Sequence, residues 1–225
     1  MNYIRIIGAS VSIADALIYQ KRNWTMKKKS AKSMTIGFIV AAVFVAIDQL
    51  TKYLAAVFLK TNGARVLIPG VFELRYLENQ SAAFGFDIVT FLQRILKITY
   101  FEANPDAFLR FKMGVFCVLT LIVVVLLGLI YRCIPQGNKR FYAMDAILIA
   151  FTAGAIGNCI DRVVHNYVID FFYFSLINFP IFNVADIYVT VSAFLMIVFG
   201  LFYYKEEDFE AVFPSKKKKT VQDAK

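Results

Sequence analysis

Apolar residues gather into four long runs separated by shorter polar stretches. The runs cover residues 34–59, 112–131, 142–162 and 185–204, and each contains few charged residues. A helix rises 1.5 Å per residue, so about 20 residues cross the roughly 30 Å of hydrocarbon in a bilayer. The pattern therefore predicts four membrane-spanning helices.

The polar stretch after the first run has two patterns of its own. Around Val66–Leu77 residues of opposite character alternate, and a Pro-Gly pair marks a turn, which predicts a small β-sheet. Residues 91–100 combine an apolar face with Arg94 and Lys97, as is typical of an amphipathic helix at the headgroups. No function is assigned to residues 96–110.

Composition and charge support a membrane protein and set its orientation. Hydrophobic residues make up 59% of the chain and aromatic residues 16%, which is unusual for a soluble domain. Basic residues cluster before the first run, between the second and third, and after the fourth, and short basic loops stay in the cytoplasm. Both termini are therefore expected in the cytoplasm, with residues 60–111 and 163–184 outside. The net charge of +9 fits an anionic leaflet, and Lys216–Lys219 is interpreted as a topological anchor rather than a nucleic-acid-binding patch.

The expected fold is an all-α membrane protein, a four-transmembrane-helix bundle with a small extracytoplasmic β-cradle and a short amphipathic helix. A cytoplasmic basic extension at 1–33 and a cytoplasmic basic tail at 205–225 flank the bundle at 34–204. Met1–Thr25 has neither a signal-peptide core nor a span. We expect it to be an upstream extension without function, with a natural start at Met26.

Cysteine and histidine counts limit the chemistry. Cys117, Cys133 and Cys159 are scattered within or at the ends of predicted helices and are interpreted as reduced and structural. His165 is the only histidine, so a zinc site with two histidines is excluded and no metal is expected. The sequence has no Gly-x-Ser-x-Gly nucleophile elbow. Carboxylates remain as the candidate catalysts.

Charged residues within the spans lie at a similar depth. Asp48 lies about 21 Å along the first span and Asp161 about 28 Å along the third, and both positions are in the outer leaflet. Lys52 follows Asp48 by one helical turn, and Asn158 precedes Asp161 and Arg162 by one turn. These spacings predict a polar seam inside the bundle. Its residues either tie helices together or contact substrate, and the tying role is favoured for Asp161 and Arg162.

Asp170 and Asp186 have no cation within four positions. Asp170 is expected in the loop before the fourth span and Asp186 at the start of that span. Two carboxylates a few ångströms apart in a partly dehydrated site share one proton, so one accepts a proton from water while the other donates to a carbonyl. The alternative is that Asp186 caps its helix and Asp170 faces solvent.

Four sequence blocks containing these residues resemble those of lipoprotein signal peptidase, also called signal peptidase II, an intramembrane aspartyl peptidase family. The blocks are Asp48-Gln-Leu-Thr-Lys52, Asn79-Gln-Ser-Ala-Ala-Phe-Gly85, Gly157-Asn-Cys-Ile-Asp-Arg162 followed by Val168-Ile-Asp170-Phe, and Phe182-Asn-Val-Ala-Asp186. One block alone is weak, but four in the family's order are specific. The resemblance implies that Asp170 and Asp186 are catalytic. It implies that the substrate-binding or supporting positions are Asp48, Lys52, Asn79, Gly85, Asn158, Asp161, Arg162, Asn183 and Ala185.

The resemblance also implies a reaction and a location. A member of this family removes the signal peptide from a prolipoprotein by hydrolysing the bond before a diacylglyceryl-modified cysteine, within the membrane. The implied location is the bacterial cell (inner) membrane, as a multi-pass protein with its active site on the extracytoplasmic side. Partners would be the lipidated prolipoprotein and membrane lipid, with no nucleic acid, no cofactor and no oligomer implied. The β-cradle and amphipathic helix would surround substrate or simply cap the external face.

Two positions depart from the family pattern. Ser81 and Asn166 stand where the family usually has glycine. Asn is the non-glycine residue most tolerant of positive φ, so we expect Asn166 to keep the turn. Ser81 affects the loop geometry beside Asn79 rather than the chemistry.

Other protein classes fit less well. A proton-coupled transporter needs polar residues spread across the bilayer, whereas the cytoplasmic halves of the spans are apolar apart from Asp145. A membrane scaffold does not explain two carboxylates beside asparagines. A presenilin-type protease would have a Gly-x-Gly-Asp signature, which is absent.

Overall fold

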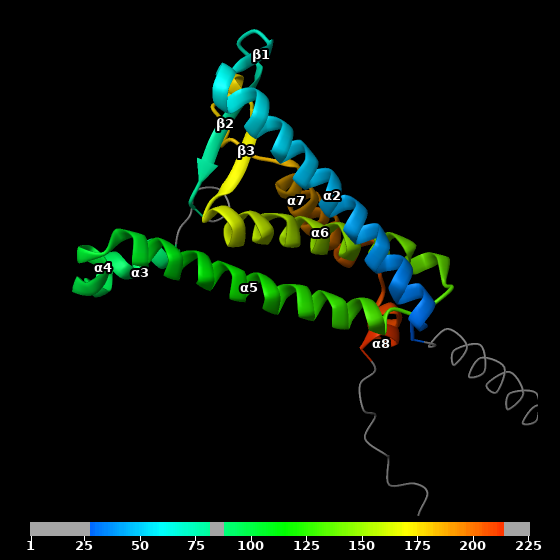
Figure 1. Cartoon of the computed structure of the whole chain (residues 1–225). Coiled ribbons are helices and arrows are strands. Elements are labelled where there is room, and N and C mark those ends of the chain that lie inside the picture. The colour runs from blue at the N-terminus through cyan, green and yellow to red at the C-terminus, as the bar shows by residue number, and fades with distance from the viewer. Residues whose placement is uncertain (1–27, 82–87, 214–225) are drawn as a thin grey trace, which may run out of the picture.

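The computed structural model describes residues 28–81 and 88–213, and within these ranges four helices are long and apolar enough to cross a membrane. They are α2 (Ala31–Asn62), α5 (Pro105–Cys133), α6 (Tyr142–His165) and α7 (Val184–Phe202), and the 3-10 turn η2 (Lys139–Phe141) precedes α6 (Figure 1). Side chains such as Phe38 and Leu201 are largely exposed on the outside of the bundle, as contact with lipid requires. The expected four-helix membrane fold is confirmed. The segments Met1–Thr25 and Lys216–Lys219 lie outside the described residues.

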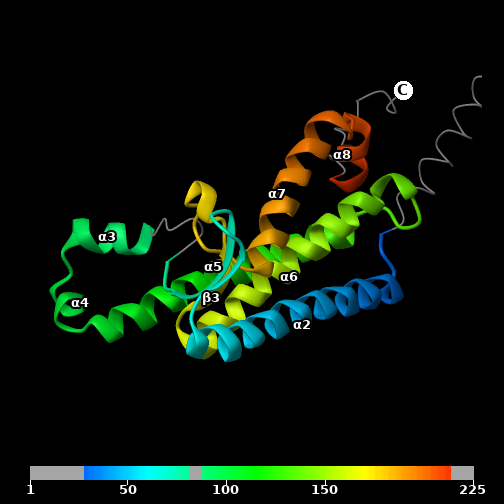
Figure 2. The same cartoon turned by 90° about the horizontal axis from the view of Figure 1, so that it is seen from above.

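Helix α6 occupies the centre and contacts α2, α5 and α7 (Figure 2). Two glycines of α6 permit its close packing against neighbouring helices. A methyl group on Gly154 would overlap the carbonyl oxygen of Ala185, and one on Gly157 would overlap the Asp48 carboxylate. Packing of α6 against α7 and α2 therefore requires glycine at both positions.

A three-stranded antiparallel sheet of order β1-β2-β3 stands where α2 ends (Figure 1). The strands β1 (Arg65–Ile68) and β2 (Phe72–Asn79) pair as a hairpin, which agrees with the small sheet predicted around Val66–Leu77. Strand β3 (Val168–Tyr173), which is followed by η3 (Ser175–Ile177), was not expected. Asp170 lies within β3 and not in the expected loop. The β-branched and aromatic residues of this strand were the overlooked signal.

Asn166 joins α6 to β3. Its φ of 62° is in the left-handed region, which confirms the expectation that asparagine holds a turn of positive φ here. The turn brings β3 back along the last turn of α6, where Asp161 reaches the backbone of Ile169.

Two short helices connect the sheet to α5. The expected amphipathic helix is α3 (Ile88–Leu96), which begins earlier than residue 91 and stops where Lys97 adopts a φ of 46°. Phe91 and Ile95 are exposed on its apolar side. Helix α4 (Thr99–Ala103) follows, and α5 begins at Pro105 rather than at residue 112. Residues 96–110 are thus mostly helical.

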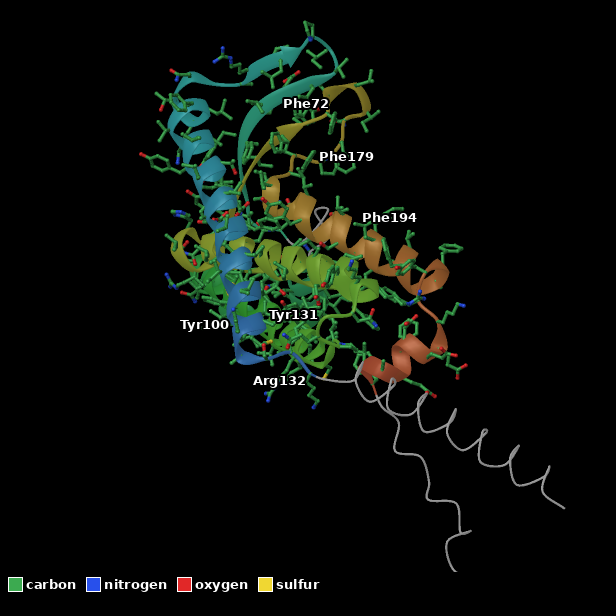
Figure 3. The ribbon with its side chains drawn as sticks, turned by 90° about the vertical axis from the view of Figure 1, so that its right-hand side faces the viewer. Phe72, Tyr100, Tyr131, Arg132, Phe179 and Phe194 are labelled. Atoms are coloured by element: carbon green, nitrogen blue, oxygen red, sulfur yellow. The ribbon has the colours of Figure 1, made fainter. Side chains whose placement is uncertain are left out.

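The opposite end of the bundle holds the α5–α6 loop and the short helix α8 (Glu206–Val212). Arg132 lies at this end (Figure 3). Lys29 forms an ion pair of 2.7 Å with Asp145, and its backbone N–H donates to the carbonyl of Arg132. Arg140 forms an ion pair of 2.8 Å with Asp208. The start of α2, the α5–α6 loop and the end of α7 therefore meet at one end.

Candidate active site

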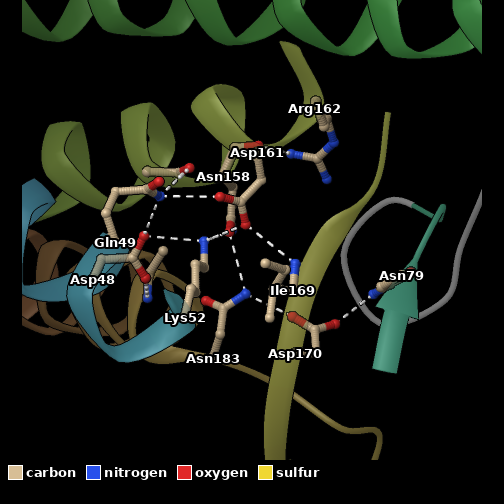
Figure 4. A network of polar contacts seen from close by, with 12 residues as sticks. Asp48, Gln49, Lys52, Asn79, Asn158, Asp161, Arg162, Ile169, Asp170 and Asn183 are labelled. Atoms are coloured by element: carbon tan, nitrogen blue, oxygen red, sulfur yellow. Dashed lines mark hydrogen bonds and ion pairs between the residues drawn. The ribbon is translucent and has the colours of Figure 1, made fainter. Parts of the chain in front are cut away.

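Asp170 is held by two asparagine amides. Its side chain is buried, and its Oδ2 accepts a hydrogen bond of 2.8 Å from Asn79 Nδ2 while its Oδ1 accepts one of 2.6 Å from Asn183 Nδ2 (Figure 4). Antiparallel pairing of β2 with β3 brings Asn79 to this position. The Ser81 backbone N–H donates to Asn79 Oδ1 at 2.8 Å. This bond directs the amide N–H of Asn79 toward Asp170, so serine at position 81 is compatible with the site.

Asp186 both caps α7 and joins the site. Asn183 is the N-cap residue of α7, and its Oδ1 accepts from the Asp186 N–H at 2.9 Å while the Asn183 N–H donates to Asp186 Oδ2 at 3.3 Å. This reciprocal capping box leaves Asp186 Oδ1 to accept a bond of 2.8 Å from Asn158 Nδ2. The capping role is therefore real, but it does not exclude a role in chemistry.

Amide groups connect the two aspartates. Asn183 Nδ2 donates to Asp170 Oδ1 and, at 3.2 Å, to Asn158 Oδ1. Asn158 in turn donates to Asp186. All four carboxylate oxygens of the pair thus accept hydrogen bonds from amides, which fixes the rotamers of both aspartates.

The environment of Asp170 favours its protonated form. The pKa of Asp170 is raised from 3.8 to about 7, first by burial and second by the negative charge of Asp186, although hydrogen bonds from Asn79 and Asn183 and the charge of Lys52 act to lower it. The two aspartates are therefore coupled electrostatically. Near neutral pH the pair can hold a proton on Asp170.

A buried ion cluster lies behind the aspartates. Lys52 Nζ is 3.0 Å from Asp48 Oδ2 and 2.9 Å from Asp161 Oδ2, and it donates to Asn158 Oδ1 at 2.9 Å (Figure 4). All three charged side chains are buried. A buried charge is tolerated when its partners and hydrogen bonds are complete. Lys52 also orients Asn158, so its amide N–H points to Asp186.

The acidic members of the cluster also bind backbone groups. Asp48 Oδ1 accepts a hydrogen bond of 2.8 Å from the Ala185 N–H, and Asp161 Oδ2 accepts one of 3.1 Å from the Ile169 N–H. Ala185 precedes Asp186 in the chain, and Ile169 precedes Asp170. The cluster therefore fixes the backbone at both aspartates.

Gln49 is a supporting residue that the sequence reasoning missed. Its Nε2 lies 3.1 Å from Asp48 Oδ2, 3.0 Å from Asp161 Oδ1 and 3.1 Å from the Gly157 carbonyl oxygen. The available signal was its place within the first sequence block, three residues before Lys52 and hence on the same helical face.

The side chains of the adjacent residues Asp161 and Arg162 lie in different environments. Asp161 enters the buried cluster, whereas Arg162 lines a cleft. The Arg162 guanidinium lies 5.3 Å from the Phe116 ring centroid and donates to the Asn158 carbonyl at 3.2 Å and to the Ser81 carbonyl at 3.5 Å. Arg162 thus connects α6 to the chain after β2.

Both aspartates open onto a cleft of about 510 Å³. Its walls come from α5, α6 and α7, and the chain before α7 closes one side. Asn79, Ser81, Asn158 and Arg162 line it together with the two aspartates. A polar rim therefore adjoins a mainly apolar groove that runs between the spanning helices.

The structure brings most of the expected residues together. The expected residues that it places in or directly behind the site are Asp48, Lys52, Asn79, Asn158, Asp161, Arg162, Asp170, Asn183, Ala185 and Asp186. Gly85 lies outside the described residues. Within residues 28–81 and 88–213, no three His, Cys, Asp or Glu side chains are grouped to hold a metal ion.

Four spanning helices with two aspartates converging on one cleft define a membrane protein with the layout of an intramembrane aspartyl peptidase. Residues 40–202 match the family described as Signal peptidase (SPase) II. The chain belongs to the signal peptidase II family, whose members process the signal peptides of prolipoproteins. The resemblance noted in the sequence and the assignment to the peptidases are confirmed.

Relatives span most of the chain. The lipoprotein signal peptidase of Brevibacillus brevis is 33% identical over 161 residues, covering 72% of this chain and 91% of the relative. That of Staphylococcus haemolyticus is 32% identical over 175 residues, covering 77% and 94%. Two solved structures of bacterial membrane enzymes share the fold. One has a TM-score of 0.58 at 24% identity and covers 86% of this chain and 98% of the other, and the second has 0.55 at 26%, covering 80% and 98%.

Proposed function

We propose that this protein is an aspartyl endopeptidase that removes signal peptides from prolipoproteins, with Asp170 and Asp186 as its catalytic pair. The observation that carries the proposal is the convergence of these two aspartates, joined through Asn183 and Asn158, on one cleft between spanning helices. Membership in the signal peptidase II family supports the reaction.

In the proposed mechanism the pair activates one water molecule. Burial and the charge of Asp186 favour a proton on Asp170. Asp186 then accepts a proton from water as that water attacks the peptide carbonyl, and Asp170 donates its proton to the developing oxyanion. The flanking amides hold both carboxylates in place, and Arg162 places positive charge beside them. No covalent acyl-enzyme forms in this scheme.

The proposed substrate is the prolipoprotein whose cysteine after the cleaved bond carries a diacylglyceryl group. The groove between the helices supports delivery from within the bilayer, because a signal helix and two acyl chains can remain in membrane lipid while the bond reaches the aspartates. The basic residues Lys29, Arg132 and Arg140 lie at the end opposite the sheet. By the positive-inside rule these residues support a cytoplasmic location for that end. The proposed location is therefore the bacterial cell (inner) membrane, with both termini in the cytoplasm and the aspartates on the extracytoplasmic side.

The test is a gel-shift assay with purified protein and a diacylglyceryl-modified prolipoprotein. Asp170→Asn and Asp186→Asn preserve shape but cannot exchange the required proton. Each is expected to reduce turnover by roughly 10²- to 10⁴-fold while the folded protein is still recovered from membranes. Substrate lacking the lipid should be cut poorly.

Asp106→Asn is the matched control, because Asp106 is an exposed aspartate in the first turn of α5. It should cleave at the wild-type rate. Wild-type rates from either Asp170→Asn or Asp186→Asn would refute the catalytic assignment.

A further inference from the structure

The cleft continues past the aspartates toward the middle of the membrane. The lining of this deeper part is mostly apolar. Around this deeper part the walls carry Leu119, Val123, Phe151, Ala155 and Val191. Two hydroxyls interrupt the apolar lining, those of Thr120 on α5 and Thr190 on α7.

The two threonines lie at a common depth. Thr190 follows Asp186 by four residues, so it is on the same face of α7 and about 6 Å deeper. Thr120 follows Phe116 by four residues, and the Phe116 ring packs beneath the guanidinium of Arg162 at the rim of the cleft. Each hydroxyl is therefore one helical turn below the polar rim, on a different wall of the groove.

Both hydroxyls are available to a ligand. Two other threonines in the spans use their hydroxyls within the helix: Thr35 donates to the Ala31 carbonyl at 3.1 Å, and Thr51 donates to the Asp48 carbonyl at 2.7 Å. Across residues 28–81 and 88–213, the structure gives neither Thr120 nor Thr190 a side-chain hydrogen bond. The groove thus presents two unused donors in apolar surroundings.

Under the proposed function, a signal peptide in this groove has backbone carbonyls that lack hydrogen-bond donors. A peptide bond can be hydrolysed only where the chain leaves its helix, and the last four carbonyls of a helix have no intrahelical partner. In hydrocarbon each unsatisfied backbone group is costly. The carbonyls just upstream of the cleaved bond are therefore exposed at the depth of the two threonines.

We propose that the Thr120 and Thr190 hydroxyls donate hydrogen bonds to backbone carbonyls of the signal peptide just upstream of the cleaved bond. One helical turn of depth corresponds to about two residues of extended chain at 3.3 Å per residue, or four residues of helix. The threonines thus hold the end of the signal helix and position the bond at Asp170 and Asp186. This inference rests on the proposed function.

The experiment is a double-mutant cycle between protein and substrate. Lipidated prolipoprotein peptides carry one ester in place of the amide at the second, third or fourth bond upstream of the cleaved one, because an ester carbonyl is a weaker acceptor. They are cleaved by wild type, Thr120→Val, Thr190→Val and the corresponding serine variants, with the exposed Thr35→Val as control. Each valine variant is expected to raise KM roughly 3- to 10-fold with kcat nearly unchanged, and serine should restore the wild-type KM.

The double-mutant cycle distinguishes failure of this inference from failure of the proposed function. Support requires that an ester at one of these bonds weakens binding to wild type but has little further effect in a valine variant. Equal ester effects in wild type and both valine variants, at all three bonds, overturn the inference while cleavage by wild type upholds the proposed function. If wild type cleaves none of the lipidated peptides, the proposed function fails and this inference fails with it.

Discussion

The Asp48 carboxylate accepts a hydrogen bond of 2.8 Å from the backbone N–H of Ala185, the residue directly before Asp186. Asp161 makes the equivalent bond, at 3.1 Å, to the residue directly before Asp170. Both proposed catalytic aspartates are thus positioned through the backbone by a second aspartate from another helix. The geometry of the site therefore depends on how those two supporting carboxylates are held.

Lys52 holds both supporting carboxylates, so its replacement should be severe. Lys52→Met leaves Asp48 and Asp161 buried without their shared cation. Removing one partner from a buried ion cluster costs about 3–5 kcal/mol, so the variant is expected to unfold at a much lower denaturant concentration in detergent and to lose activity. Lys60→Met is the control, because Lys60 pairs with Glu78 at the surface, and no measurable change is expected. Wild-type stability of Lys52→Met would show that the cluster does not support the fold.

Gly157 tests the contact between α6 and α2. A methyl group there overlaps the Asp48 carboxylate, so Gly157→Ala must displace the group that binds the backbone before Asp186. Overpacking of this kind costs about 1–3 kcal/mol, and we expect that loss of stability with a larger loss of cleavage. Gly114→Ala on α5 meets nothing within 4 Å and should behave as wild type. Equal activity of the two variants would contradict the proposed positioning role of Asp48.

Much of the architecture follows from local sequence rules. Hydrocarbon requires long apolar helices, so the four spans could be predicted from composition, and charged residues at one depth indicated where the site lies. Helical spacing correctly placed Lys52 beside Asp48. These inferences succeed because each depends on residues within a few positions of one another.

The remaining features depend on contacts between distant segments. Strand β3 pairs with β2, and this pairing brings Asn79 to Asp170 across 91 residues. The bridging of Asp170 to Asp186 by amides likewise depends on α6 and α7 being packed through Gly154. No local periodicity specifies such a register. The sequence could therefore name the aspartates, but it could not show that asparagines connect them.

The pH dependence of cleavage should show the protonation of Asp170. Burial raises the pKa of Asp170 to about 7, and the mechanism needs its protonated form. We expect kcat/KM to fall as the pH rises through about 7, with a tenfold loss per pH unit beyond it. The measurement is the initial rate of cleavage from pH 5 to 9 in one detergent. A flat profile between pH 6 and 9 would rule out Asp170 as the proton donor.

The same ionisation should affect stability. The pKa of Asp170 is 3.8 when unperturbed and about 7 in the folded protein, so between these values the folded state keeps a proton that the unfolded state has lost. The free energy of unfolding therefore declines as the pH rises through this window. Asp170→Asn cannot ionise, and at pH 8 it should be more stable than wild type by at most about 4 kcal/mol, at about 1.4 kcal/mol per pKa unit. The difference should shrink toward pH 4, and a constant difference would contradict the shift.

Asn79 should set the position of the alkaline limb of the activity profile. Its amide donates to Asp170 Oδ2 at 2.8 Å, and this hydrogen bond lowers the pKa of Asp170 because it stabilises the ionised form. Asn79→Ala removes the donor, so the limb should move to higher pH while kcat below pH 6 falls because the carboxylate is less firmly held. Asn62→Ala is the matched control, since the Asn62 amide donates only to the Phe58 carbonyl at the end of α2. A limb that stays in place or moves to lower pH in Asn79→Ala, measured as kcat/KM against pH beside both wild type and the control, would show that Asn79 does not tune the proton on Asp170.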